Sequence, residues 1–520
     1  MTYAYAIAKA WISPTNGIDP TQIPRAATNI CGTKDSSMIP KRQLADVEPT
    51  QNQDLTCLYC LQQEPGRRLF LPEPALPSYF DYKVGTRAAL RTPFVVDQQL
   101  AEDILPYMTI YNVGKMAWLA LFSPLASHPG PPLRAWTKIP AIYTTISGND
   151  HKIFTALHRK YGPVVRIAPK ELSFASGSPA FQDIYGSRRP GQPKPFKPRN
   201  WYGKSSNGAD SLITADDATH HRQRKILSNS FSDKALKEQE PLLKHWAEKM
   251  AMKLRSRATD GAEVDLLKIY NCTAFDLMGD LTFAEDLNMI EEGEYSSWVK
   301  AIFSGVKLFA QRVEAEHWNY CKERVDRRLK KTPDRPDIWS KVLEMSQGPE
   351  ALSLDEHHSN ASLFMVAGTE TIATALSGTT YHLLQNPSVL AKLTAEIRSS
   401  FRSVDDFHLK DLARQKYLMA VLHEGLRMYP PLPILVPRVV PDGGMKIDDH
   451  WVPGGTVVGV HHYATYRSEA HFRRADEFLP ERWLGDPEFA DDHLDTLEVF
   501  SVGPRNCLGQ SQDHVSSRED

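Results

Sequence analysis

Apolar residues along this chain recur mainly at helical spacing. Between residues 215 and 430 they follow the three- and four-residue period of long amphipathic helices. One helix is predicted over 416–428, where it stops before Pro430 and Pro431, and another over 359–384. Short stretches within 433–460 are strand-like and are separated by glycine-rich turns. The pattern predicts a mainly α protein with a small β region.

The first part of the chain has a different pattern. Residues 1–110 contain clusters of Pro, Gln and Asp with little periodicity, so we expect an irregular or disordered extension unrelated to the rest. Residues 111–126 include an uninterrupted apolar run, 116–122, which is shorter than the roughly 20 residues that a membrane span needs. We expect residues 127–520 to form one folded domain. Within it, 158–168 is predicted to be a helix end, a turn and a strand.

The composition limits the classes of protein. The 520 residues are 41% apolar and carry a formal net charge of −2, which indicates a globular protein and gives no basis for nucleic-acid binding. Six cysteines are too few for a disulfide scaffold and fit a reducing compartment. Cys57 and Cys60 have the spacing of a metal or redox pair, but no second pair follows at a useful distance, so we interpret them as incidental.

The segment 500–509 carries the strongest chemical signal. It places Cys507 between Gly503 and Gly509, with Arg505 two positions before the sulfur. Glycine permits backbone angles and close approaches that a side chain would block, and nearby positive charge lowers the pKa of a thiol. The segment therefore suits presentation of a thiolate to a metal from a tight loop. For the cysteine alone, the alternative is a buried structural residue in a Gly/Pro turn.

A second signal is a pair of charges in the helix predicted over 416–428. Glu424 and Arg427 are three residues apart and share one helix face, so their charges can pair. Most pairs of this kind are solvated surface bridges that contribute little to stability. The spacing by itself therefore does not distinguish a surface bridge from a buried pair.

A third signal lies inside the helix predicted over 359–384. Gly368 and the neighbouring threonines are poor residues for a helix interior. The hydroxyl of Thr371 can bond the carbonyl of Ala367 and bend the helix locally. Gly368 would leave room beside this bend, and Glu370 would supply an acid that can pass protons inward. The alternative is a small-residue contact between two core helices.

In their order and approximate spacing, the three signals resemble the cytochrome P-450 family, over about residues 111–509. The style of the sequence is most similar to filamentous-fungal members used in secondary metabolism. The resemblance implies the cytochrome P-450 fold, with haem b (iron protoporphyrin IX) as cofactor. It also implies that Cys507 is the axial ligand of the haem iron, in a loop shaped by Phe500, Gly503 and Gly509.

The resemblance assigns further contacts. Arg482 would join Glu424 and Arg427 in a buried charge network behind the haem loop, since buried charges must be paired. Arginine suits a planar carboxylate because its fork can bind both oxygens. The residues that match the family's contacts to the haem propionates are His220, Arg224, Arg438 and Arg505. The register of the first two stays open, because His221 and Arg222 are alternatives.

The function implied by the resemblance is that of a monooxygenase, which inserts one oxygen atom of O2 into a lipophilic small molecule. Glu370 and Thr371 match the acid and alcohol of the family's oxygen-activating helix. Candidate residues for an apolar substrate pocket are Phe364, Ala367, Gly368, Ile434, Leu435 and Val436. Electrons would come from NADPH-cytochrome P-450 reductase. The enzyme would be a monomer on the cytosolic face of the endoplasmic reticulum membrane or, with no convincing span, cytoplasmic.

Two features depart from the family. The anchor segment 111–126 is poorly apolar, and the chain ends 13 residues after Cys507 in a polar stretch, where the family continues into a helix and a β-hairpin. We therefore keep as an alternative an inactive truncated relative, or a mis-predicted gene product, that binds haem poorly. Haem chemistry without a reductase is disfavoured by the pair of Glu370 and Thr371. The sequence names neither the substrate nor the oxidised carbon.

Overall fold

The structure is a computed structural model that describes residues 98–189, 191–260, 263–300, 310–331, 335, 337–346, 348–403 and 406–512. Its longer helices are α2 (Gln98–Leu121), α5 (Asp150–Tyr161), α8 (Asp217–Leu227), α9 (Asp233–Thr259), α10 (Leu266–Phe283), α13 (Ala310–Leu329), α15 (Leu354–Gln385), α16 (Pro387–Ser400) and α18 (Lys416–Met428). Shorter helices are α3 (Pro132–Trp136), α4 (Ile139–Ser147), α6 (Ser178–Tyr185), α7 (Arg199–Tyr202), α11 (Met289–Glu292), α14 (Ile338–Met345), α17 (Leu409–Leu412) and α19 (His462–Tyr466). The strands are β1 (Val164–Ala168), β2 (Glu171–Phe174), β3 (Arg438–Val439), β4 (Met445–Ile447), β5 (His450–Val452) and β6 (Val457–Val460).

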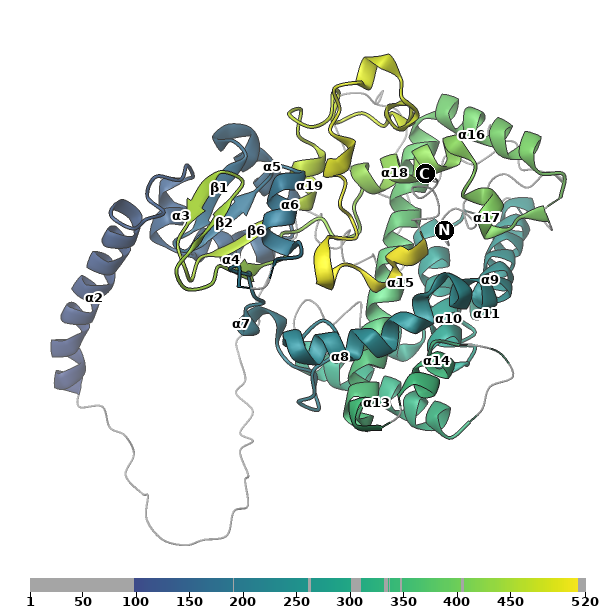
Figure 1. Cartoon of the computed structure of the whole chain (residues 1–520), viewed down its shortest axis with the longest axis horizontal. Coiled ribbons are helices and arrows are strands. Elements are labelled where there is room, and N and C mark those ends of the chain that lie inside the picture. The colour runs from purple at the N-terminus through teal and green to yellow at the C-terminus, as the bar shows by residue number, and fades with distance from the viewer. Residues whose placement is uncertain are drawn as a thin grey trace, which may run out of the picture.

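Helix α15 forms the axis of the helical part of the molecule (Figure 1). It packs against α10, α13 and α18, and its N-terminus is fixed by a capping box in which Ser353 and Glu356 bond each other's backbone N–H groups. Most of α10 is buried, including Phe275 and Met278, because neighbouring helices cover it on several sides. The helical core therefore surrounds the segment that carries the third sequence signal.

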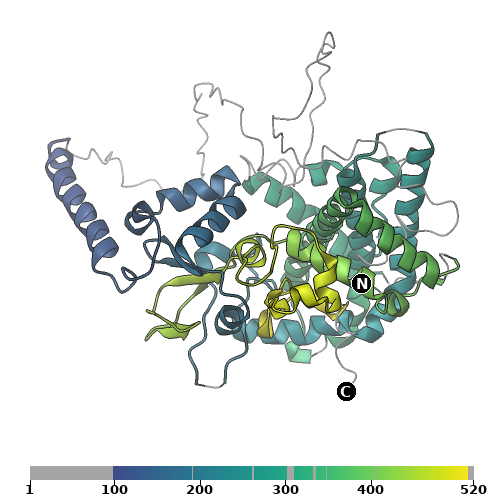
Figure 2. The same ribbon diagram turned by 90° about the horizontal axis from the view of Figure 1, so that it is seen from above.

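A small sheet lies beside the helices (Figures 1 and 2). Its strand order is β1-β2-β6-β3, with β2 and β6 parallel and the other two pairs antiparallel. Strands β4 and β5 form a separate hairpin. Tyr185 and Tyr466 are buried in the apolar cluster under the sheet. The parallel pair joins residues about 290 positions apart, so the sheet ties the start of the domain to its last third.

The prediction of a mainly α protein with a small β region is confirmed. Helix α18 has the predicted bounds, and α15 (Leu354–Gln385) begins before the predicted 359 and ends one residue after the predicted 384. The segment 158–168 is a helix end, a turn and β1, as expected. These elements could be predicted because their apolar spacing and their proline or glycine stops agree with each other.

The boundary of the N-terminal extension differs from the prediction. Residues 1–97, including Cys57 and Cys60, lie outside the described residues. Residues 98–110, expected to be irregular, belong to α2, which continues through Pro106. The missed helix has no single apolar face, so its sequence lacks the period that would have revealed it. No described helix is both long and apolar enough to cross a membrane.

Candidate functional site

The cysteine loop is held by its own backbone. The N–H of Cys507 donates to the carbonyl of Phe500 at 2.8 Å, which closes the turn. Gly503 has a φ of +76°, and a Cβ there would collide with the backbone of Tyr185 and Gly186, so this position requires glycine. Gly509 is different, since an added Cβ would meet only the Cys507 sulfur, at 3.8 Å. Cys507 itself is exposed.

Helix α8 holds this loop from one side. Its N-terminus is capped by Asp216, which accepts from the Thr219 N–H, and the helix then presents Arg224 to the loop. The Arg224 guanidinium donates to both the backbone carbonyl and the side-chain oxygen of Asn506, each at 2.6 Å. Burial lowers the pKa of Arg224, and the nearby charge of Cys507 opposes that shift. In this structure Arg224 clamps the residue before the cysteine, and its contact with a haem propionate stays a prediction.

Four basic side chains gather beside the cysteine loop, and we call Lys197, His220, Arg438 and Arg505 the cationic cluster. Burial, followed by the charges of Arg438 and Arg505, lowers the pKa of Lys197 to about 6. Burial, followed by the charge of Arg505, lowers the pKa of His220 to about 3. Both pKa values are lowered because the side chains are partly buried and because neighbouring positive charges disfavour their protonated forms.

The cationic cluster fits the two carboxylates of haem. Arg505 donates to Asp217 and to the Ala215 carbonyl, but its Nη1 atom is buried without a hydrogen-bond partner. Asp217, whose side chain is 63% exposed, is the acid that pairs with Arg505. A buried donor without an acceptor is unfavourable, and an incoming carboxylate would satisfy Arg505 while relieving the repulsion on Lys197 and His220.

Three residues that the sequence reasoning missed also belong to this region: Tyr185, Tyr202 and Lys197. Arg438 is buried, its guanidinium lies over the rings of Tyr185 and Tyr202, and its Nη1 donates to the Tyr202 hydroxyl at 2.6 Å. Lys197 lies over the Tyr202 ring, 4.6 Å from its centre. Lys197 and Tyr202 come from an irregular, proline-rich segment and the short helix α7, which show no period that points to a site.

The predicted bend contact in α15 is present. Thr371 donates from Oγ1 to the carbonyl of Ala367 at 2.7 Å, and both residues are on the accessible side of the helix. Gly368, however, does not leave open room, because an added Cβ would strike the thioether of Met278 in α10. Gly368 therefore allows α10 and α15 to approach closely, which was the alternative interpretation of this position.

The predicted pocket residues divide into two groups. Phe364 is buried between Phe231 and Trp339, with ring centres 5.7 and 5.9 Å apart, and is a core residue. Val366, which the sequence reasoning did not select, is 39% exposed next to Ala367 and is a further candidate lining residue. Of the three predicted residues after Pro433, Ile434 is half-buried, whereas Leu435 and Val436 pack against the apolar clusters of the sheet.

The three predicted members of the charge network are in contact. Arg427 donates from Nε and Nη2 to both carboxylate oxygens of Glu424 at 2.8 Å, and Arg482 donates from Nε at 3.2 Å. All three side chains are fully buried. Burial opposes ionisation of Glu424, but the two arginines keep the pKa of this carboxyl below its usual value. The i, i+3 pair is therefore a buried junction and not a surface bridge.

The junction connects helix α18 to the segment before the cysteine loop. Glu424 also accepts from the Leu479 N–H and from the Trp483 indole N–H, at 2.8 and 2.9 Å. Arg427 donates to the carbonyls of Tyr466 and Ala475 at 2.8 and 2.7 Å. Segments far apart in sequence are thus held in one geometry behind the loop.

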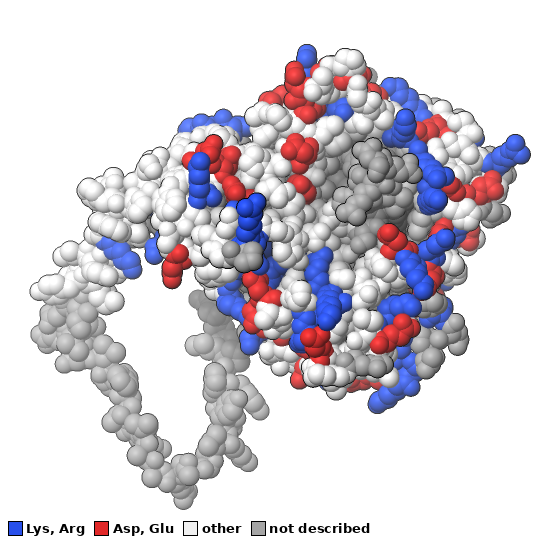
Figure 3. Space-filling view, in the orientation of Figure 1, with Lys and Arg blue, Asp and Glu red and all other residues white. Residues whose placement is uncertain are grey.

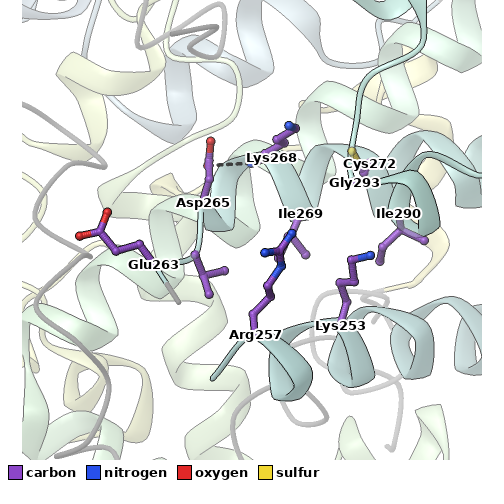
Figure 4. Close-up of a pocket in the computed structure, with 10 residues that line it drawn as sticks. Lys253, Arg257, Glu263, Asp265, Lys268, Ile269, Cys272, Ile290 and Gly293 are labelled. Atoms are coloured by element: carbon purple, nitrogen blue, oxygen red, sulfur yellow. Dashed lines mark hydrogen bonds between the residues drawn. The ribbon is translucent and has the colours of Figure 1, made fainter. Parts of the chain in front are cut away.

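A separate cavity of about 190 Å³ lies between the end of α9, the start of α10 and α11 (Figure 4). Lys253, Arg257, Glu263, Asp265 and Lys268 give it a mixed-charge lining, and Cys272 lies at its inner wall. None of the site residues predicted from the sequence lines this cavity. It is therefore distinct from the region around Cys507 and α15.

Comparisons with known proteins show the family of the chain. The family profile described as Cytochrome P450 matches residues 128–315 and 310–511. The chain is 42% identical over 447 residues to cytochrome P450 monooxygenase efuB of Hormonema carpetanum, covering 81% of this chain and 88% of that protein. It is 37% identical over 417 residues to averantin hydroxylase of Dothistroma septosporum, covering 76% and 78% respectively. The chain belongs to the cytochrome P450 family.

The cofactor and the reaction class follow from membership of the cytochrome P450 family. The family's cofactor is haem b, and this chain is a haem-dependent monooxygenase that uses O2 and a redox partner to oxidise a small organic molecule. Its relatives are fungal enzymes, among them cytochrome P450 monooxygenase FUM2 of Gibberella moniliformis, at 38% identity over 427 residues, 75% of this chain and 88% of that protein.

Proposed function

We propose that Cys507 is the axial ligand of haem, that the cationic cluster holds the haem carboxylates, and that Glu370 and Thr371 move protons for the reaction. When bound, haem supplies the activation of dioxygen. The observation that carries this proposal is the cationic cluster beside the cysteine loop, with the buried, unpartnered Nη1 of Arg505. A cluster of basic groups next to an exposed cysteine suits a dianionic, thiolate-ligated cofactor, because its carboxylates would favour the charged forms of Lys197 and His220.

The residues of α15 have separate tasks in this proposal. Thr371 keeps its hydroxyl on the Ala367 carbonyl, so the hydroxyl proton is directed at a fixed acceptor until a stronger one arrives. Glu370 precedes it and offers a carboxyl as the second proton-transferring group; one of its oxygens, Oε1, is buried. Val366 and Ala367 present apolar surface on the accessible side of the helix, which favours a lipophilic substrate.

Thr371→Ala is expected to uncouple the reaction while leaving the fold intact. The variant loses one hydroxyl that bonds the helix's own carbonyl, so haem content and melting temperature should be nearly unchanged. Groups that transfer protons typically contribute about 10²–10⁴-fold to the rate, so product formed per NADPH should fall by at least about tenfold, the remainder appearing as peroxide. Product, peroxide and NADPH are measured together.

Thr369→Ala is the matched control on the same helix. Thr369 makes the same kind of bond, to the Met365 carbonyl at 2.6 Å, but it is fully buried in the core. This control should lower the melting temperature and leave the ratio of product to NADPH unchanged. Equal coupling in Thr371→Ala and the parent would remove Thr371 from the proton path.

We further propose that the domain rests on a membrane surface through α2 and α4. On α4, Ile139, Ile142, Tyr143 and Ile146 lie on one face and are 54–80% exposed. Helix α2 adds exposed side chains such as Tyr111 and Trp118, and Figure 3 shows few charges over this part of the molecule. A contiguous exposed apolar face marks an interaction site. We propose a location at the endoplasmic reticulum membrane on this basis and on family resemblance.

Liposome flotation tests the membrane proposal. Burying one Ile side chain contributes about 1.5–3 kcal/mol, so the double variant Ile142→Glu, Ile146→Glu should reduce binding to phosphatidylcholine–phosphatidylserine vesicles by at least about tenfold. Met252→Glu is the control, because Met252 is 58% exposed on α9, away from this face. Equal flotation of the double variant and the control would contradict the proposal.

The electron donor and the oligomeric state are proposed from the family alone. We propose that NADPH-cytochrome P-450 reductase supplies the electrons and that the enzyme acts as a monomer. Reconstitution with the purified reductase tests the donor, since NADPH consumption should then require both proteins. Sedimentation of the detergent-free enzyme at several concentrations tests the proposed monomer. A monomer should sediment as one species whose sedimentation coefficient does not change with concentration.

A further inference from the structure

The N-terminal turn of α15 is tied to α8 by a buried polar junction centred on Glu356. One carboxylate oxygen of Glu356 accepts from the guanidinium of Arg222 and, at 3.0 Å, from the side-chain amide of Gln223. The other oxygen accepts from the Ser353 N–H at 2.9 Å. Glu356 is buried, and Gln223 is fully buried. One side chain thus receives three donors from two elements.

Further contacts fix the same two helices. Asn360, one turn along α15, is fully buried and donates to the Glu356 carbonyl at 2.9 Å and, more weakly, to the Gln223 oxygen at 3.4 Å. Its own side-chain oxygen accepts from the Leu212 N–H at 2.8 Å. Arg222 also donates to the carbonyls of Glu350 and Ala351. The helices therefore meet at one defined register.

On another face, α8 contacts the cysteine loop. Arg224 lies two residues after Arg222 on a different face of the helix, and it clamps both oxygens of Asn506 next to Cys507. His220, one turn earlier, belongs to the cationic cluster. Helix α8 is therefore a rigid link with α15 on one side and the cysteine loop on the other, and Figure 1 shows it crossing the lower part of α15.

A helix cap alone does not explain Glu356. The capping box with Ser353 uses one oxygen of the carboxylate and would be complete without Arg222 or Gln223. Burial opposes ionisation of Glu356, while the hydrogen bond from Arg222 helps to keep its pKa below the usual value. The charge is thus maintained in a buried place by the side chains of α8.

We propose that Glu356 is a positioning residue for the haem site, because its junction with Arg222 and Gln223 sets the distance between the cysteine loop, held by α8, and the oxygen-activating part of α15. The inference rests on the proposed roles of Cys507 and Thr371. Glu356 touches neither of them. Thr371 lies 15 residues further along the same helix, roughly 22 Å at about 1.5 Å per residue, so the junction acts through the two helices as rigid bodies.

The consequence concerns the spacing of the cysteine loop and α15. Under the proposed function, Cys507 would hold haem and α15 would carry the groups that move protons for the reaction, so this spacing has to be maintained. Without the carboxylate, α8 and α15 keep only the weaker Asn360–Gln223 bond and the Arg222 bonds to the carbonyls before α15, so α8 can shift against α15 and carry the Asn506 clamp with it. A shifted loop should release haem faster and weaken the bond from sulfur to iron, even when the domain stays folded.

The test compares Glu356→Gln with Ser353→Ala in the full-length, haem-loaded protein. Two readouts are used: the rate of haem transfer to excess apomyoglobin, and the fraction of the reduced carbon-monoxide complex that shows the red-shifted thiolate band. Glu356→Gln should accelerate haem transfer on the order of tenfold, which is the lower range of what a charged hydrogen bond contributes. It should also lower the fraction of the carbon-monoxide complex that shows the red-shifted thiolate band. Ser353→Ala, which loses the capping hydroxyl, should lower the melting temperature without either change.

Arg222→Gln and Glu350→Gln extend the comparison. Arg222→Gln should reproduce the effect of Glu356→Gln, and the double variant should be no worse than either single, because both remove the same junction. Glu350→Gln breaks the exposed Lys225–Glu350 pair, which joins α8 to the segment before α15 at the surface, and should leave both readouts unchanged. If Glu356→Gln transfers haem as slowly as Ser353→Ala, or if Arg222→Gln behaves as the parent, the inference is wrong. A parent enzyme without the thiolate band would instead refute the proposed function.

Discussion

Replacing Cys507 with serine is expected to abolish both the thiolate spectrum and monooxygenase activity. The thiolate donates electron density that favours cleavage of the O–O bond, and an alcohol oxygen at the same position is not ionised at neutral pH. The reduced carbon-monoxide complex of the variant should lose the red-shifted band completely, and product formation should fall to the assay background. The optical spectrum and product analysis of the same preparation check both results.

The choice of Cys507 over the other described cysteines has a physical basis. Burial raises the pKa of Cys272 to about 12, and it raises the pKa of Cys321 well above the usual range of a thiol. Both are therefore buried, protonated thiols, whereas Cys507 is exposed and close to Arg224. Cys272→Ala is the control and should retain the thiolate band. A Cys507→Ser protein that keeps the band would disprove the assignment.

Glu424→Ala is expected to remove a large fraction of the stability of the domain. It would leave Arg427 and Arg482 buried without their shared carboxylate, and it would also orphan the indole N–H of Trp483. Breaking a buried ion pair by removing one partner costs about 3–5 kcal/mol, against a total stability of about 5–15 kcal/mol. The melting temperature should fall on the order of 10 °C, with loss of bound haem.

An exposed pair nearby provides the control for this variant. Glu477 pairs with Arg474 at 2.6 Å, and both side chains are about half exposed. Exposed ion pairs contribute little, so Glu477→Gln should melt with the parent. Thermal unfolding followed by circular dichroism, together with haem absorbance, measures both effects. If Glu424→Ala and Glu477→Gln melted alike, the buried network would not be a structural junction.

The site was predicted best where the contacts are local. The bond from Thr371 to Ala367 joins residues four apart, so helix geometry alone dictates it. Glu424 and Arg427 are likewise fixed by helical spacing, and their pairing with Arg482 followed from the family resemblance. The core contacts of Phe364 were not predicted, because a helix face can be read from the sequence but the neighbour that covers it cannot. Trp339 and Phe231 cover that face.

The sequence by itself determined α15, α18, β1, the family and the cysteine loop. These depend on the spacing of apolar residues, on the steric limits of proline and glycine, and on a thiol between two glycines, all of which are short-range properties. The tertiary structure decided which charges are buried and what each one bonds. Lys197 joined the cationic cluster, Gly368 met Met278, and Arg224 clamped Asn506 only once distant segments packed together. Burial and pairing arise from contacts between residues far apart along the chain, which no local pattern encodes.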